Sequence, residues 1–177
     1  MEVLKFETLD VLKDLHNLTV KIMQPLPLSI LDPHRGKTAD QDLKNTLKQN
    51  GVYFLLEQRG FNIEFSPFSE NVIYIGKAGG KGEKIFHRCR KHFCSLIDLK
   101  TAKGDSRERP GKGLIRIRER RGKSVEGIYF CPGLIFSGER QVTVEHHPYL
   151  ISLVEEFLLY LYRQRNDGRL PEGNVKS

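Results

Sequence analysis

Two short runs of β-branched and aromatic residues constrain most strongly what this chain can fold into. Residues 51–57 read GVYFLLE and residues 71–76 read NVIYIG, and each run is bounded by Gly, Asn or Pro. Runs of this kind are typical of β-strands. Only about a dozen residues separate the two runs. The sequence therefore predicts two neighbouring strands joined by one loop.

Periodicity along the rest of the chain predicts a mixture of helices and strands. Apolar residues three and four apart predict helices over residues 8–24, 40–49, 84–99 and 149–165. Alternation with period two (LIRIR) and short apolar runs predict further strands at 114–118, 126–130 and 141–145. The expected fold class is α+β, a small central antiparallel-type sheet flanked by helices.

The 177 residues fit a single domain, and we find no linker that would divide it. Residues 1–50 are expected to be an N-terminal helical extension of that domain, and 51–177 its main body, with a basic insertion around 100–124. No apolar run approaches the roughly 20 residues that span a bilayer, and the N-terminus lacks the pattern of a signal peptide. We therefore expect a cytoplasmic protein without membrane contact.

Positive charge is concentrated in one part of the chain. The net charge is +7, and residues 77–123 hold 16 of the 29 Lys and Arg residues but only 5 of the 22 Asp and Glu residues. Such polarisation is typical of a protein that binds a polyanion. Nucleic acid is the expected partner, because this basic segment is rich in Gly and lacks the long amphipathic helix of a membrane-binding protein.

Cysteine spacing argues against a disulfide framework and against zinc. Cys89, Cys94 and Cys131 fit neither a CxxC pattern nor an even set of pairs, so we expect reduced, partly buried thiols. His87 and His92 alternate with two of these cysteines, but within one helix the four side chains cannot converge on a metal. The Gly-rich run 76–82 lacks the residue order of a P-loop.

Two predicted helices carry polar residues at the margin of an apolar stripe. On the helix over 84–99, Arg88 and His92 are four residues apart and share one edge of the stripe. Arg offers a fixed charge and His can exchange a proton near neutral pH, a combination suited to a phosphate. On the last helix, Leu150, Val154, Phe157, Leu158 and Leu161 form the predicted core stripe. Glu155 lies just outside that stripe, whereas Glu156 points nearly opposite.

These pieces together resemble the GIY-YIG nuclease superfamily. The tripeptides stand as GVY (51–53) and YIG (74–76), followed by Lys77, and the stretch RCRKHF (88–93) resembles the family's pattern of Arg, three residues and His. VEEFLLYLYRQRN (154–166) resembles its metal-binding helix, which ends near an Asn. The resemblance covers roughly residues 50–166 and is closest to the type II restriction endonuclease branch.

The resemblance implies a nuclease fold and a set of catalytic residues. These are Tyr53, Tyr74, Lys77, Arg88, His92, Glu155 and Asn166, with Asn174 as the alternative to Asn166. Glu155 would be the one metal ligand, binding Mg²⁺ (or Mn²⁺ in its place) that stabilises the leaving 3′-oxygen. No small-molecule cofactor is implied.

The implied mechanism assigns each of these side chains a task. Tyr53 would be the general base, its pKa lowered by positive charge on Lys77, Arg88 or His92. Arg88 would neutralise the charge that develops on the phosphate. Tyr74 would position the water or the phosphate.

The expected function is a Mg²⁺-dependent DNA endonuclease, most simply a site-specific type II restriction enzyme. The alternatives are another standalone GIY-YIG nuclease (mobile-element, phage or repair-associated) and a non-catalytic nucleic-acid-binding protein. The residues expected to contact double-stranded DNA are Lys81, Lys84, Arg90, Lys91, Arg107, Arg109, Lys112, Arg116, Arg118, Arg120 and Arg121. Cutting both strands favours a homodimer on DNA. Its interface is expected on the helix over 8–24, unless that helix packs on its own sheet.

Overall fold

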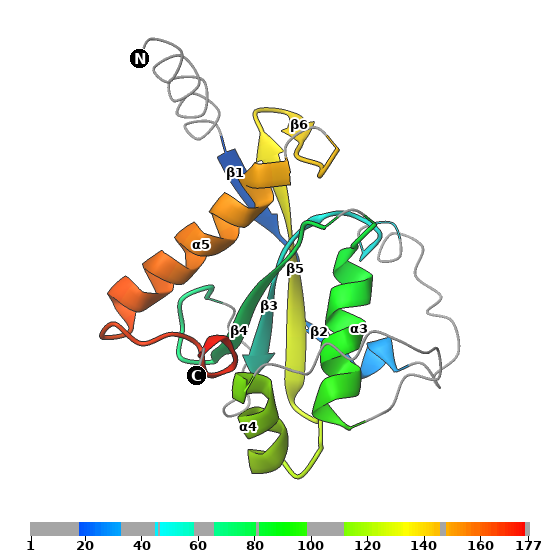
Figure 1. The fold of residues 1–177 in the computed structure, drawn as a ribbon, viewed down its shortest axis with the longest axis vertical. Helices are drawn as coiled ribbons and strands as arrows, with labels where there is room; N and C mark the ends of the chain where they lie inside the picture. The colour runs from blue at the N-terminus through cyan, green and yellow to red at the C-terminus, as the bar shows by residue number, and fades with distance from the viewer. Residues whose placement is uncertain are drawn as a thin grey trace.

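The fold is organised around one long central strand. The computed structural model describes residues 18–32, 45, 47–58, 66–80, 82–98, 112–145 and 148–175. Strand β5 (Ile128–Ser137) has β1 (Leu18–Ile22) on one side and β3 (Gly51–Glu57) on the other, and β4 (Val72–Ala78) forms the outer strand next to β3. The short strands β2 (Leu26–Pro27) and β6 (Arg140–Gln141) also pair with β5. All pairings are antiparallel (Figure 1).

The predicted pair of neighbouring strands is present as β3 and β4. Tyr53 pairs with Gly76 and Leu55 pairs with Tyr74, so the two tyrosines lie on adjacent strands close to each other. Every residue of β3 is buried, as expected for a strand that has a neighbour on each side and helices on both faces of the sheet. This rigid strand carries the first tyrosine of the candidate site.

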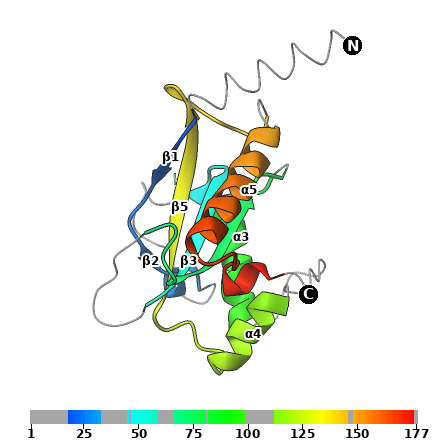
Figure 2. The same cartoon turned by 90° about the vertical axis from the view of Figure 1, so that its left-hand side faces the viewer.

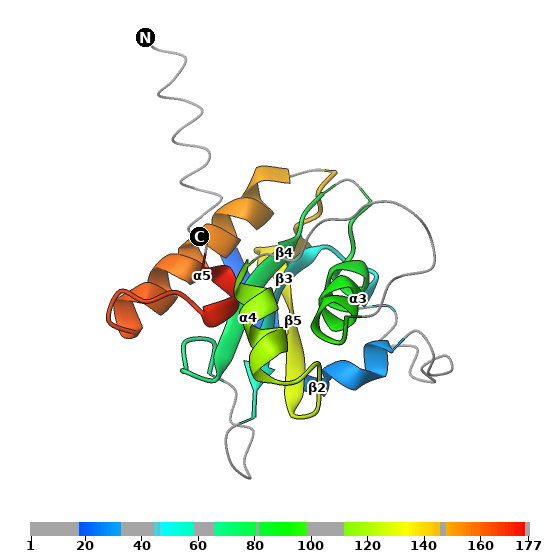
Figure 3. The ribbon, with the colours of Figure 1, turned by 60° about the horizontal axis from the view of Figure 1, so that its bottom comes forward.

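Two helices cover opposite faces of the sheet. Helix α3 (Ile85–Leu96) lies on one face and α5 (Pro148–Arg165) on the other, as Figure 3 shows. On the α3 side, Cys89 and Phe93 pack with Tyr53 in one apolar cluster. On the α5 side, Val154 and Leu158 pack with the alternate residues of the same strands in a second cluster. The sequence predicted both helices correctly.

A third helix packs at the free edge of β4. Helix α4 (Lys112–Arg120) contacts the 3₁₀ turn η2 (Glu172–Asn174), and η2 in turn contacts β4. Figure 2 shows α4 and η2 next to each other at one end of the molecule. Gly113 makes this contact possible, because a Cβ there would stand 2.4 Å from the Glu172 carbonyl oxygen. A second 3₁₀ turn, η1 (Leu28–Leu31), packs against α3.

The helix predicted over residues 8–24 is wrong for its last part. Residues 8–17 lie outside the described residues, but Leu18–Ile22 is strand β1, paired with β5 from Leu18↔Ser137 to Ile22↔Gly133. The segment LTVKI satisfies both periods, because Leu18, Val20 and Ile22 also alternate with polar residues. Pairing with β5 selects the strand. These three side chains are partly buried against the α5-side cluster of the same chain, so this part of the segment packs on its own sheet.

The strand predicted over residues 114–118 is also wrong, because this segment belongs to α4. Its buried side chains, Leu114 and Ile117, are three residues apart, as a helix requires. The strand expected at 126–130 is the start of the longer β5, and the strand expected at 141–145 reduces to Arg140–Gln141. Most of the helix expected over 40–49 falls outside the described residues. None of the helices in the described ranges is long and apolar enough to cross a membrane.

Candidate active site

Strands β3 and β4 bring the two tyrosines of the GVY and YIG segments together. The Tyr53 and Tyr74 rings are stacked with their centroids 6.1 Å apart. Gly76 lies directly beneath them, since a Cβ at this position would stand 2.5 Å from the Tyr74 ring and 2.6 Å from the Tyr53 hydroxyl. Gly51 begins β3 with a φ of 157° and approaches the Gly133 carbonyl oxygen, which a side chain would block.

Helix α3 adds His92 and Arg88 to the tyrosine pair. The Tyr53 hydroxyl and His92 Nε2 are 2.7 Å apart and form a buried hydrogen bond. The Tyr74 ring lies 4.7 Å from the His92 ring, centroid to centroid. Tyr53 is fully buried and His92 is only 7% exposed, whereas Tyr74 and Arg88 are partly exposed. Any ligand would therefore meet Tyr74 and Arg88 first.

The protonation states of this cluster differ from the sequence-based expectation. Burial raises the pKa of Tyr53 well above its usual range, and only the charge of Arg88 and a hydrogen bond from it act in the lowering direction. Burial together with the charges of Arg88 and Lys91 lowers the pKa of His92 to about 3. His92 is thus neutral and supplies no positive charge. The expected lowering of the Tyr53 pKa is not found in this state of the protein, because burial outweighs the neighbouring guanidinium.

A network that the sequence did not reveal holds Arg88 in position. Arg88 Nη1 donates to Glu83 Oε1 at 3.3 Å, and the Asn50 side-chain amide donates to the Glu83 carbonyl oxygen at 2.6 Å. Although burial opposes it, the nearby Tyr53 and Glu83 raise the pKa of Arg88, so the guanidinium stays charged. Asn50 thus anchors the loop before α3, and the sequence could not show this because the contact joins residues 33 positions apart.

A charged pair lies on the other side of the sheet, where α5 packs on β4. Lys77 Nζ and Glu155 Oε2 are 2.8 Å apart, and the Glu155 side chain is 13% exposed. Glu156 is exposed, so the predicted difference between the two glutamates is confirmed. Burial raises the pKa of Tyr74. The charge of Arg88 acts to lower this pKa, and the charge of Glu155 acts to raise it. Tyr74 is therefore within electrostatic reach of both groups at the outer edge of β4.

Glu155 is the candidate ligand if this site holds a divalent metal. Among the described residues, no group of three or more His, Cys, Asp or Glu side chains could enclose an ion. One carboxylate suits Mg²⁺, which keeps several of its waters and uses few protein ligands. Lys77 already binds one oxygen of this carboxylate, so a metal would share Glu155 with it.

All three cysteines are free and buried, as expected.

Comparison with protein-family models, with curated proteins and with solved structures finds no match. The geometry of the residues themselves is therefore what bears on function.

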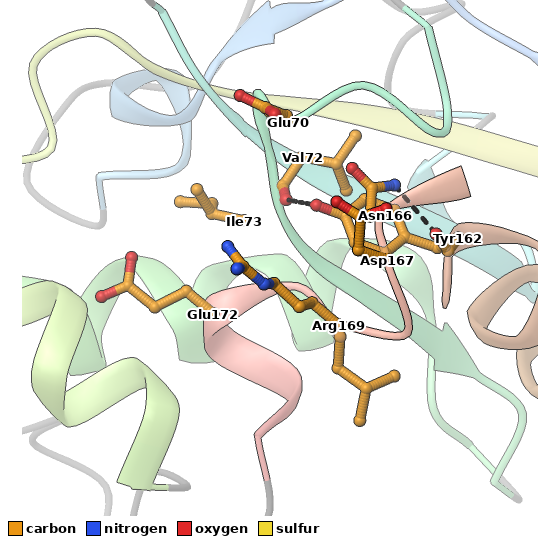
Figure 4. A pocket seen from close by; sticks show the side chains of 9 residues that line it. Glu70, Val72, Ile73, Tyr162, Asn166, Asp167, Arg169 and Glu172 are labelled. Carbon is orange, nitrogen blue, oxygen red and sulfur yellow. Dashed lines mark hydrogen bonds between the residues drawn. The ribbon is translucent and has the colours of Figure 1, made fainter. Parts of the chain in front are cut away.

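The predicted site residue Asn166 does not join this cluster. Its side-chain amide donates to the Tyr162 carbonyl oxygen at 2.8 Å and to the Phe68 carbonyl oxygen at 3.0 Å, which closes the end of α5. It lines a pocket of about 290 Å³, shown in Figure 4, that includes none of the other predicted catalytic residues. The alternative, Asn174, is nearer to the tyrosines. It binds both backbone groups of Ile75, next to Tyr74, at 2.8 and 2.7 Å.

The predicted DNA-contacting residues divide into three groups. Five of these basic side chains are exposed or partly exposed and lie on α3, on α4 or directly before α3: Lys84, Arg90, Lys91, Lys112 and Arg116. Arg118, Arg120 and Arg121 are held by acidic partners, Asp98, Glu57 and Glu172. Lys81, Arg107 and Arg109 lie outside the described residues. The ion pairs of the second group hold α4 in place, which makes these three arginines less available for DNA.

Proposed function

We propose that this protein is a Mg²⁺-dependent endonuclease that hydrolyses phosphodiester bonds of double-stranded DNA at specific sites. The observation that carries the proposal is the arrangement around the outer edge of β4. There a Tyr53–His92 hydrogen bond and a charged Arg88 approach from the α3 side, and a single shielded carboxylate, Glu155, approaches from the α5 side. This set of groups suits the hydrolysis of a charged phosphodiester better than that of a neutral substrate.

The scissile phosphate binds beside Tyr74. Its negative charge faces Arg88, which offers a planar fork of donors that matches two phosphate oxygens. Tyr74 is the more exposed of the two tyrosines and lies within electrostatic reach of both Arg88 and Glu155. Arg88 stabilises the phosphate most strongly when the extra negative charge of the transition state develops, because it is already fixed by Glu83 and needs no reorganisation.

The proton of the attacking water leaves through Tyr53 and His92. The water gives a proton to the Tyr53 oxygen as the phenolic proton moves to His92 Nε2, which is 2.7 Å away. The low pKa of His92 opposes this transfer in the free protein. The bound phosphate favours the transfer, because a nearby negative charge stabilises the imidazolium form of His92. His92 is thus neutral until substrate arrives.

Lys77 and Glu155 prepare the metal site. In the absence of metal, Lys77 compensates the charge of the shielded carboxylate and fixes its position against β4. When Mg²⁺ is bound by Glu155, it supplies stabilisation for the negative charge on the leaving oxygen.

Each chain contains one such site, so one chain cuts one strand. Double-strand cleavage then requires two chains related by a two-fold axis on a palindromic site. Light scattering of the protein on a cleavable duplex tests this arrangement. Two chains per duplex are expected, and a stable 1:1 complex that nicks one strand would contradict it.

Incubation of supercoiled plasmid with the protein tests the proposed activity. We expect discrete linear fragments with Mg²⁺ and intact plasmid when EDTA replaces the metal. A smear of fragments would support a nuclease but contradict site specificity. Plasmid that is retarded in a native gel yet remains uncut in Mg²⁺ would contradict the proposal and favour a non-catalytic DNA-binding protein.

A further inference from the structure

The turn η2 supplies a hydrogen-bonding partner for the outer edge of β4. Asn174 Oδ1 accepts from the Ile75 N–H at 2.8 Å, and the Asn174 side-chain N–H group donates to the Ile75 carbonyl oxygen at 2.7 Å. An Asn side chain carries one acceptor and one donor group, so it can take the place of a neighbouring strand at a single residue. Asn174 therefore fixes the backbone of β4 directly after Tyr74.

The backbone of η2 also lies against the Tyr74 ring. Gly173 is buried, and a Cβ at this position would stand 2.8 Å from Tyr74 Cδ2 and 2.8 Å from the Ile73 carbonyl oxygen. Only a residue without a side chain allows such a close approach of the backbone. Gly173 is thus one of the groups that fix the ring of the more exposed tyrosine, and it belongs to an element outside the rest of the site.

Helix α4 holds η2 in this position. A Cβ at Gly113 would stand 2.4 Å from the Glu172 carbonyl oxygen and 2.7 Å from Gly173 Cα, so the backbones of α4 and η2 are in direct contact. At the other end of α4, Arg120 Nη2 donates to Glu172 Oε2 at 3.0 Å. Figure 4 shows the Glu172 side chain extending from η2 towards α4. The turn η2 therefore contacts both α4 and Tyr74.

Helix α4 is also expected to contact DNA. Lys112, its first residue, and Arg116, about one turn later, are both exposed. Lys112 directly precedes Gly113, which contacts η2. A phosphate bound by Lys112 would therefore lie one residue away from the contact that leads through η2 to Tyr74.

We propose that α4 positions Tyr74 through η2, with Gly173 and Asn174 as the positioning residues. This role rests on the proposed function, because it concerns the side chain beside which the scissile phosphate binds. Gly173 and Asn174 act on the ring and on the strand rather than on the DNA. Loss of their contacts should therefore lower the rate of cleavage and leave DNA affinity unchanged.

Gly113→Ala tests the link between α4 and the site. Ala is a better helix former than Gly, but its Cβ requires Glu172 and Gly173 to move. We expect single-turnover cleavage of plasmid in Mg²⁺ to be about tenfold to a hundredfold slower, since a misplacement of about 1 Å can cost about a hundredfold in rate. Affinity for a DNA duplex, measured by anisotropy in EDTA, should not change. The matched control, Glu119→Ala on the exposed side of α4, should cut at the wild-type rate.

Asn174→Ala tests the same role without adding volume. It should show the same loss of rate at unchanged affinity. By NMR, the Ile75 amide proton should exchange with solvent about tenfold faster, the scale of one hydrogen bond. Asn166→Ala removes a comparable pair of hydrogen bonds at the end of α5 and controls for stability. It should leave the exchange of the Ile75 amide unchanged.

The outcomes separate this role from the proposed activity. A wild-type rate in Gly113→Ala would overturn the proposal, since α4 would then have no part in placing Tyr74. A wild-type rate in Asn174→Ala would overturn it as well, and so would a loss of rate that only follows a loss of DNA affinity. In each of these cases the unmodified protein still cuts DNA. An unmodified protein that cuts no DNA would instead contradict the proposed function, and this role with it.

Discussion

At the scale of single residues, the candidate site depends on one charge that is fixed and one proton that is mobile. Arg88 is charged and held by Glu83, whereas His92 is buried, neutral and hydrogen-bonded to Tyr53. These two side chains are one helical turn apart on α3 and both interact with Tyr53, but one is charged and the other is neutral. Substitutions of the two should therefore have different consequences.

Loss of Arg88 should affect catalysis far more than DNA binding. Arg88→Ala should slow single-turnover cleavage by about a hundredfold to a thousandfold, the scale of other preorganised charge donors, with a modest loss of affinity. Arg88→Lys should recover only part of the rate, because an ammonium group lacks the planar fork. Rates from quenched-flow cleavage and affinities from DNA titration separate the two effects. A near-normal rate for Arg88→Ala would remove this residue from the site.

The buried neutral His92 should make stability depend on pH in acid. The His92 pKa is about 3 in the folded protein and about 6.5 when unfolded, so between these values the unfolded chain binds the extra proton. The contribution is fully present above pH 6.5 and is lost as the pH falls through this window. The slope is at most about 1.4 kcal/mol per pH unit.

Chemical denaturation at pH 7, 5.5 and 4.5 measures this effect. The free energy of unfolding of the wild-type protein should fall more steeply than that of His92→Phe, which keeps a ring but cannot be protonated. Parallel curves for the two proteins would show that His92 is not buried in its neutral form.

The sequence predicted which residues form the candidate site but not most of their contacts. The spacing of Arg88 and His92 predicted that they share one edge of a helix, and they do converge on the tyrosines. The state of Tyr53 was not predictable, because it depends on complete burial and on a partner 39 residues away. The sequence favours Asn166 over Asn174 because Asn166 lies at the end of the last predicted helix. The path of the chain after α5 is what brings Asn174 to β4.

At the scale of elements, α4 is attached to the sheet by ion pairs that centre on one buried carboxylate. Glu57, at the end of β3, is 6% exposed and receives hydrogen bonds from Arg120 and Arg121. Burial alone would raise the pKa of Glu57, but these hydrogen bonds from the two guanidinium groups lower it. The attachment explains why two arginines of the basic segment, Arg120 and Arg121, bind Glu57.

Removal of the Glu57 charge should loosen α4. Glu57→Gln is expected to lower the free energy of unfolding by about 1–3 kcal/mol, the range for buried hydrogen bonds to charged groups. Glu172→Gln, which removes a more exposed partner of Arg120, should have a much smaller effect. Urea denaturation of both variants provides the comparison. Equal effects would mean that burial of Glu57 does not strengthen its ion pairs.

The exposed face of α4 should contribute to DNA binding through phosphates. Lys112 and Arg116 are exposed, and neutralising both should flatten the dependence of affinity on salt by roughly one unit of slope for each phosphate that the protein no longer neutralises. Arg120→Ser should change stability but not this slope, since Arg120 is already paired with Glu57 and Glu172. Fluorescence anisotropy across a salt series measures both. An unchanged slope for the double variant would show that α4 faces away from DNA.

The sequence predicts the type of an element when its apolar spacing fits either a helix or a strand. It does not predict the type when the spacing fits both. Residues 51–57 and the helices near 84–99 and 149–165 are assigned correctly because their patterns fit only one structure. LTVKI and LIRIR each fit two patterns, and tertiary pairing decides between them. β5 selects a strand for Leu18–Ile22, and packing of Leu114 and Ile117 selects a helix for α4.

At the scale of the whole molecule, the sheet edge brings together groups from both of its faces. Tyr53, Arg88 and His92 come from the α3 side, and Lys77 with Glu155 from the α5 side, so β4 must be the outer strand for them to meet. The predicted α+β class and the helices on both faces of the sheet are confirmed. The order of strands was not predictable, because it depends on β1 and β5, whose pairing has no local signal in the sequence.

The most direct test of the central claim compares two adjacent glutamates on α5. Glu155 is shielded and paired with Lys77, whereas Glu156 is exposed. Glu155→Gln should abolish Mg²⁺-dependent cleavage of plasmid DNA in single-turnover assays while DNA affinity is retained, and Glu156→Gln should cut at the wild-type rate. Wild-type cleavage by Glu155→Gln, or loss of cleavage in Glu156→Gln alone, would contradict the proposed site.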